Sequence, residues 1–362
     1  MTTPPLTQPL GRSLVPLPGE SLTGFVLRLS CRLELPPARI AALTGLVPAG
    51  NSGARPPLGL LTEIPASARQ TFACMTRLTT SEVVQLGLAS LHKRYPLFAG
   101  ATKNTAASHP LSNDYPVLAP ATRYCPDCLA GDGSPIQEAF GGAWRKIWHL
   151  PVVFACPTHQ RLLEDRCTDC DQVVHSLRPG APAVLLPATR ARALHPAQCR
   201  TVLDPGKGRT LPACCGARID HIPKRRPAAP ELIALQLKIL DLLAPDGTAH
   251  TLSAGHQTDP IHYFTDLQAL MLQACSTWPA VRHLSPSDEA ADAIDHHLQW
   301  LRQRIASSRS GSASTRSLPM VFDPPPADAA ASAGLLHLAD HILLSGSPDC
   351  SASHWVSMSA SR

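Results

Sequence analysis

The sequence predicts a mostly α-helical protein with small β-hairpin elements in a cysteine-rich centre. Apolar residues recur at helical spacing in the N-terminal part of the chain and again shortly after residue 230. Eight of the twelve cysteines fall within the 91 residues from Cys125 to Cys215. Proline is frequent, with 37 of 362 residues, which favours many short elements over one continuous sheet. Hydrophobic residues make up 44% of the chain, enough for a sizeable core.

The N-terminal part predicts two pairs of helices. Residues 22–33 form one apolar stripe, Ser21 can cap the first turn, and a Leu-Pro-Pro break follows at 35–37. A second helix is expected from Pro37 to about residue 43 or 44. The second pair comprises residues 66–77 and a helix that begins at the capping box 79–82 and runs to about residue 93.

Either pair can form a helix-turn-helix, so residues 1–120 are expected to be a helical, helix-turn-helix-like domain. Reading DNA would require an exposed polar face at the start of the second helix of a pair. Arg39 and Gln85 are the candidate residues at these positions. An ordinary helical hairpin in a core is an equally good interpretation of both pairs.

The cysteine block begins with two short turns that each offer two metal ligands. Cys125 and Cys128 enclose a Pro-Asp pair, which places two thiolates on one tight turn. Cys156 and His159 repeat this spacing after an interval of 27 residues. Together they make a Cys₃His set, which is typical of a structural zinc site.

A second set of ligands is expected directly after the first. Cys167 and Cys170 form another knuckle, and Cys199 and Cys215 are its expected partners, which gives a Cys₄ set. Cys215 is preferred over Cys214 because a glycine follows it and permits the close turn of a knuckle. Scattered buried or disulfide-bonded cysteines are one alternative, and three two-ligand pairs within 46 residues argue against it. An iron–sulfur cluster is the other, and the histidine and the knuckle spacing favour zinc over it.

Two structural zinc ions per chain are therefore expected within a zinc-finger module at residues 121–226. Four protein ligands fill a tetrahedral shell, whereas a catalytic zinc keeps one position for water. The nearby histidines are better interpreted as surface or satisfied polar residues than as ligands: His149, His175, His195 and His221. Neither a nucleotide-binding P-loop nor a zinc-protease or serine-hydrolase motif is present, so the chain is not expected to be an enzyme.

The remainder, residues 227–362, is expected to be a helical region that ends in a low-complexity, disordered or truncated tail. Residues 231–243 predict a strong amphipathic helix. After residue 305, Ser, Gly, Ala and Pro predominate, including residues 307–314 and 324–334, which predicts linker or disorder.

The charge is unevenly distributed along the chain. Residues 1–120 hold 10 basic and 5 acidic residues, residues 121–230 hold 15 and 9, and residues 231–362 hold 7 and 13. The first two parts suit an anionic partner such as double-stranded DNA. The short basic run at 224–226 is better interpreted as a solvated linker than as a phosphate clamp.

No signal peptide and no apolar stretch long enough to span a membrane are recognisable in the sequence. Twelve cysteines without a secretory signal indicate a reducing compartment, so a cytoplasmic, DNA-associated protein without a membrane partner is expected.

Several motifs together resemble the TniQ family of transposition proteins, similar to the N-terminal part of TnsD-type target selectors. They are the Pro-Leu-Pro-Gly-Glu-Ser-Leu run at 16–22, the knuckle preceded by Arg123 and Tyr124, the pair Trp144 and Trp148, and the two later knuckles. The resemblance extends from residue 14 to about residue 220. The lone Cys199, the doubled Cys214-Cys215 and the short acidic C-terminal third depart from the family pattern.

The resemblance implies a non-enzymatic bacterial protein that selects or marks target DNA. Its implied partners are an AAA+ ATPase regulator and the transposase complex, and a second copy of the chain, as a homodimer, is a further candidate. A free-standing zinc-containing DNA-binding regulator is the first alternative function. A metallo-hydrolase is the second, and it would require an open metal position.

Overall fold

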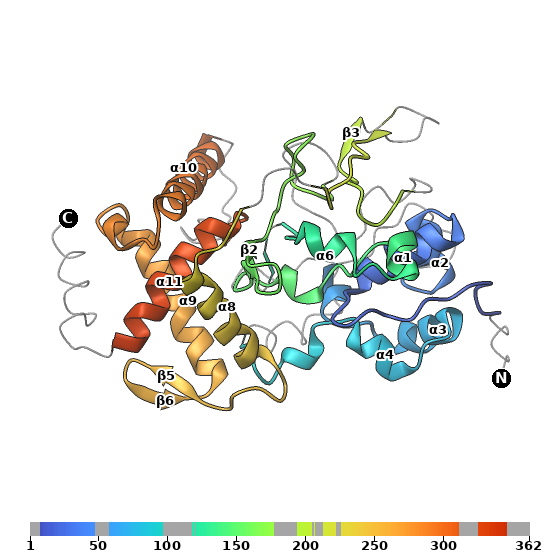
Figure 1. Ribbon diagram of the computed structural model, residues 1–362, viewed down its shortest axis with the longest axis horizontal. Coiled ribbons are helices and arrows are strands. Elements are labelled where there is room, and N and C mark those ends of the chain that lie inside the picture. The colour runs from blue at the N-terminus through green and yellow to red at the C-terminus, as the bar shows by residue number, and fades with distance from the viewer. Residues whose placement is uncertain are drawn as a thin grey trace.

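The computed structural model describes residues 8–47, 58–96, 118–119, 121–176, 194–204, 206, 213–221, 226–310 and 325–345. About half of the structure is helical, with small antiparallel sheets. The helices α1 to α4 lie at one side of the molecule and α8 to α11 at the other, and the cysteine-rich centre lies between them (Figure 1). In the described residues each sheet is a single hairpin of two strands.

The N-terminal helices largely follow the sequence pattern. They are α1 (Leu22–Leu33), α2 (Pro37–Leu43), η1 (Leu58–Leu61), α3 (Ala66–Thr76), α4 (Thr80–Gln85) and η2 (Ala89–Leu91). Ser21 caps α1 by accepting a hydrogen bond from the Gly24 amide at 3.1 Å. Thr79 and Glu82 form the expected reciprocal capping box of α4. The predicted spans of the first three α-helices are confirmed.

The fourth helix is shorter than predicted, because α4 ends at Gln85 and does not reach residue 93. Beyond it, the amides of Leu88 and Ala89 donate to the carbonyls of Leu61 and Thr62, at 3.0 and 2.9 Å, and so leave the helical pattern. Gly87 allows this approach, since a Cβ there would lie 2.5 Å from the Thr62 oxygen.

The helix-turn-helix stays a prediction. Arg39 is exposed on α2, but its neighbours Pro37 and Ala38 are buried, so this seven-residue helix presents little polar surface at its start. Gln85 is exposed at the end of the six-residue α4. Both helices are short for recognition helices, and both pack into the N-terminal core.

The centre of the chain is built from short elements. They are α6 (Pro126–Ala130), α7 (Pro135–Phe140), η3 (Lys146–His149), β1 (Ala155–Cys156), β2 (Arg161–Leu162), β3 (Val202–Asp204) and β4 (Ala213–Cys214). Strand β1 pairs with β2, and β3 pairs with β4, both in antiparallel register. These two hairpins are the small β elements that the sequence predicted.

The C-terminal part is more helical than predicted. It contains α8 (Pro230–Leu243), β5 (Thr251–Ser253), β6 (His256–Thr258), α9 (Pro260–Thr277), η4 (Arg282–Leu284), α10 (Asp288–Ser310) and α11 (Ala329–Ser345). The prediction of linker at 324–334 was wrong from residue 329 onward, where α11 begins. It was also wrong at residues 307–310, which belong to α10. Residues 311–324 and 346–362, also expected to be linker or low-complexity tail, lie outside the described part of the chain.

Small residues explain α11. Ala329, Ala330, Ala333 and Ala339 are buried, and such side chains let neighbouring helices approach closely. Gly334 contributes in the same way, because a Cβ there would lie 3.0 Å from the Ile294 side chain on α10. A composition that suggested low complexity is therefore the packing face of a buried helix.

Among the described residues, the apolar side chains form three clusters. One lies within the N-terminal helices, and one joins α9, α10 and α11. The third surrounds the cysteine-rich centre and continues into α8, α9 and α11. The predicted domain boundary at 226 and 227 stays a prediction, and this third cluster extends across it.

Candidate metal centres

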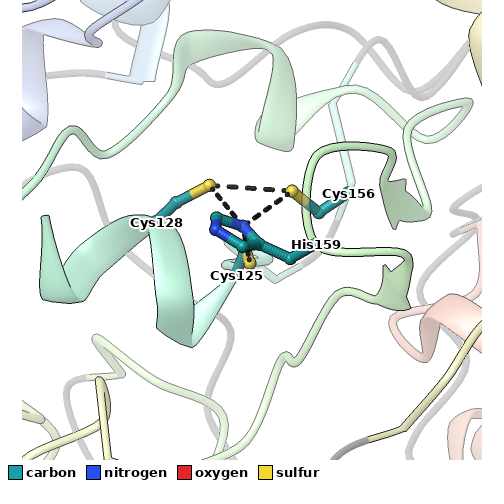
Figure 2. Close-up of side chains that lie close together, drawn as sticks. All are labelled: Cys125, Cys128, Cys156 and His159. Carbon is teal, nitrogen blue, oxygen red and sulfur yellow. Dashed lines mark hydrogen bonds between the residues drawn. The ribbon is translucent and has the colours of Figure 1, made fainter. Parts of the chain in front are cut away.

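The first ligand set comes together between a helix and a hairpin (Figure 2). Cys125 precedes the first turn of α6 and Cys128 lies within that helix, whereas Cys156 ends β1 and His159 occupies the turn before β2. The His159 Nδ1 atom lies 3.4 Å from each of the three sulfur atoms, and the sulfur atoms of Cys128 and Cys156 are 3.6 Å apart. All four ligand atoms therefore point to one centre.

These spacings match the edges of a tetrahedron around a metal ion. With metal–sulfur bonds of about 2.3 Å, two sulfur ligands of a tetrahedral ion lie roughly 3.8 Å apart, and a sulfur and a nitrogen roughly 3.6 Å apart. A disulfide would bring the sulfur atoms to about 2.05 Å. None of the described cysteines forms a disulfide.

Local sequence explains the first cluster. Pro126 is the first residue of α6, where its fixed φ favours a helical turn directly after Cys125. Gln160 has a φ of 48°, which closes the turn that carries His159. Gly142 lies against the backbone of Cys128, because a Cβ there would be only 2.0 Å from the Cys128 carbonyl oxygen.

The second ligand set also converges. The sulfur atoms of Cys167 and Cys215 are 3.8 Å apart, and those of Cys170 and Cys199 are 3.9 Å apart. All four sulfur atoms lie within 4.8 Å of one another. Cys214 lies outside this cluster, and Gly216 has a φ of 75°, as expected for the turn after Cys215.

Both clusters could therefore hold a metal ion. Within the first cluster, hydrogen bonds from Cys125 and Cys128 lower the pKa of Cys156, whereas the contacts of Cys125 with Cys128 and Cys156 raise the pKa of Cys125. Within the second, a hydrogen bond from Cys199 lowers the pKa of Cys167 to about 5. Each cluster thus stabilises one thiolate, while neighbouring thiols have raised pKa values and stay protonated. A divalent cation would displace these protons on binding.

A buried arginine joins the two elements that carry the first cluster. Arg161 on β2 donates to Asp127, next to Cys128, at 3.0 Å, and to Glu164 at 2.9 Å. Its side chain is 2% exposed. Sequence reasoning missed this residue. Its only signal was an arginine two residues after a ligand histidine.

A glutamine from α8 supports the strand that carries Cys156. The buried Gln236 side-chain oxygen accepts from the Phe154 and Ala155 amides at 2.7 and 2.9 Å. The amphipathic pattern of α8 predicted the helix but gave no sign of this contact, which joins residues 82 positions apart.

Trp144 connects the two clusters with the N-terminal helices. It is 1% exposed, its ring nitrogen donates to the Pro196 carbonyl at 3.0 Å, and its ring packs on Tyr124 at a centroid distance of 5.8 Å. A Cβ on Gly24 of α1 would lie 2.8 Å from the Trp144 Cβ. The Trp144 carbonyl also accepts from the Ser21 amide at 2.7 Å.

The run at 16–22 thereby packs directly onto the cysteine-rich centre. Within it, Glu20 forms a buried ion pair with Arg28 of α1 at 2.9 Å. Burial raises the pKa of Glu20 to about 7, although the Arg28 guanidinium and the Leu17 amide oppose this shift.

The other histidines lie outside both clusters. His149 and His175 are buried, and burial lowers their pKa values to about 4 and about 3. Burial also lowers the pKa of His195, and His221 pairs with Asp220 at 3.0 Å. Of the basic run at 224–226, Arg226 is described.

Residues 12–163 match the family model of TniQ. This match assigns that part of the chain to the TniQ family, which is a family of non-catalytic, transposition-associated proteins. The resemblance seen in the sequence is confirmed over this range, which includes the first cluster and ends before Cys167. A search of curated proteins found no match. No helix of the described residues is both long and apolar enough to cross a bilayer.

Proposed function

We propose that each cluster binds one structural zinc ion, the first through Cys125, Cys128, Cys156 and His159. The second would use Cys167, Cys170, Cys199 and Cys215. The donor set and the spacing support zinc, because three or four soft thiolates at tetrahedral edges are the ligands it prefers. Four protein ligands leave no position for an activated water, which argues for a structural role and against a metallo-hydrolase.

Element analysis of protein purified under reducing conditions tests this proposal. Two zinc ions per chain are expected, and iron at cluster stoichiometry or no metal would reject it. Cys128→Ser should lose one zinc ion, whereas Cys214→Ser, a matched change at a cysteine outside both clusters, should retain two. Loss of zinc in both variants would show that the assignment of ligands is wrong.

We propose further that the chain is a non-enzymatic adaptor in transposition. In this role it selects or marks target DNA and recruits an AAA+ ATPase regulator and, through it, the transposase. Membership of residues 12–163 in the TniQ family is the observation that carries the proposal. A bacterial cytoplasmic, DNA-associated location and self-association as a dimer belong to the same proposal.

Co-purification of the full chain with the AAA+ ATPase of the same transposon, with and without DNA, is the test. The full chain is required, because the apolar cluster around the metal centres continues beyond residue 226. Association in at least one condition is expected. If the ATPase never associates while the chain still binds DNA, the free-standing DNA-binding regulator becomes the better account.

DNA binding itself is proposed to be electrostatic, because residues 1–230 carry 25 basic and 14 acidic side chains. Affinity for duplex DNA should therefore fall as the salt concentration rises. Protein binding releases the cations condensed on the phosphates, and this release becomes less favourable at higher salt. Affinity for duplex DNA that is the same at about 50 mM and about 200 mM salt would contradict this mode of binding.

A further inference from the structure

Arg123 is a fully buried cation two residues before the first metal ligand. Among the described residues its guanidinium donates to four backbone carbonyls and one hydroxyl and forms no direct ion pair, although the Asp165 and Asp328 carboxylates lie near enough for their charges to favour the cation. On one side Nη1 donates to the carbonyls of Pro151 and Val153, at 3.2 and 2.8 Å. The side chain is charged at neutral pH, because arginine is effectively always protonated in proteins.

The other acceptors of Arg123 lie in the first turn of the C-terminal helix and in the turn before it, about 200 residues away in sequence. Nη2 donates to the Pro326 carbonyl at 2.7 Å and to the Ser332 hydroxyl, and Nε donates to the Ala327 carbonyl at 3.0 Å. These residues form the start of α11 and the turn before it. Undocking α11 would remove three of the five hydrogen bonds of a buried charge, an unfavourable change unless Arg123 also moves.

Arg123 lies between two segments that carry ligands of the first cluster. Its neighbour Tyr124 pairs with Glu164 through two backbone hydrogen bonds of 2.8 Å, and Cys125 follows directly. The carbonyls of residues 151 and 153 lie on the segment that leads into β1 and Cys156. Both the guanidinium and two of its acceptors are thus attached to ligand-bearing segments that a bound ion would draw together.

A second contact joins the same parts of the chain. Asp328 caps α11 by accepting from the Ala330 amide at 2.6 Å, and it pairs with Arg226 at 3.3 Å. Arg226 also lies 3.6 Å from Glu164, the residue that pairs with Tyr124. The N-terminal end of α11 is therefore connected by two arginines, Arg123 and Arg226, to the segments that carry the first cluster.

We propose that metal binding at the first cluster and docking of α11 are thermodynamically coupled through Arg123. The C-terminal helix is then a metal-dependent element, released when the first cluster loses its ion. By linkage, the factor by which metal binding strengthens the docking of α11 equals the factor by which docking of α11 raises the metal affinity of the first cluster. This inference rests on the proposed metal binding, and Arg123 acts in it as a positioning residue.

Hydrogen–deuterium exchange of the full-length, zinc-loaded protein tests the coupling, with element analysis performed first. Removal of zinc with a chelator should speed exchange in peptides from 329–345 together with those from 123–163. Peptides from the N-terminal helices, residues 22–43, should change much less. This part of the experiment requires no substitution and so does not depend on how a variant folds.

Arg123→Met is the variant arm, and Arg166→Met is its matched control. Arg166 directly precedes the ligand Cys167 but is 55% exposed and has no contact with α11 in the described structure. Arg123→Met should speed α11 exchange even with zinc bound and weaken zinc at the first cluster by at least about fivefold, the lower end of typical couplings. Arg166→Met should change neither.

Two results would overturn the coupling. One is α11 exchange that stays unchanged on zinc removal while peptides 123–163 lose protection. The other is simultaneous loss of protection in every peptide, including 22–43, because that indicates global unfolding. Purified protein that contains no zinc would instead reject the metal proposal itself, and element analysis separates that case before exchange is measured.

Discussion

Replacing Gly142 with alanine should weaken metal binding at the first cluster while adding only one methyl group. The Gly142 amide donates to the Leu129 carbonyl at 2.9 Å, so its backbone lies against the end of the ligand-bearing helix α6. An alanine Cβ would lie 2.0 Å from the Cys128 carbonyl oxygen, and contacts under 3.0 Å essentially never occur for real Cβ atoms. The two backbones must therefore move apart by about 1 Å, the difference between these two distances.

This displacement is large compared with what the metal centre tolerates. Metal–ligand distances are held within about 0.2 Å of their ideal values, so a shift of this size at Cys128 must be absorbed by the ligand turn. Overpacking of this kind typically destabilises by about 1–3 kcal/mol. If the change falls on the metal-bound state, it lowers metal affinity by roughly 5- to 150-fold.

Cobalt substitution followed by competition with a chelator measures the affinity of the first cluster directly. Gly59→Ala is the control, because a Cβ there would meet no atom within 4 Å. Gly142→Ala should release the first metal ion at lower chelator concentration, with the second ion unaffected. Equal affinity in the two variants would refute the argument that Gly142 determines the position of Cys128.

Three further outcomes are expected. Cys215→Ser should unfold at lower urea concentration than Cys214→Ser, because only Cys215 lies in a ligand cluster. Gln236→Leu should lower the free energy of unfolding by about 1–3 kcal/mol per orphaned strand amide, whereas Leu237→Ala on the exposed face of α8 should change it little. Burial lowers the pKa of His149 to about 4, below its unfolded value of 6.5. The unfolded state therefore takes up a proton first, so the stability contributed by neutral His149 is fully present above pH 6.5 and is lost as the pH falls towards 4. At pH 5 the loss of unfolding free energy should be on the order of 2 kcal/mol, and His149→Gln should not show it. Urea unfolding in excess zinc measures this difference, and the same pH dependence in both proteins would contradict the prediction.

The sequence alone determined the local features of this protein. Helices such as α1 and α8 could be delimited because their caps, proline positions and apolar periods act within a few residues. The knuckles were recognisable for the same reason, since two ligands three residues apart reach one ion from a single turn. The family resemblance also depended on such short motifs, and the match over 12–163 confirmed it.

Tertiary structure decided everything that depends on contacts between distant segments. The end of α4 is set by backbone pairing with residues 61 and 62, and the helical state of α11 is set by burial of small side chains that look like linker in isolation. Arg123 stood out only as part of a motif and Gln236 looked like an ordinary polar residue, because their acceptors and donors lie 28 to 209 positions away. A buried polar group acquires its role only when folding removes water and leaves particular partners within reach, and that selection is not written in the spacing of neighbouring residues.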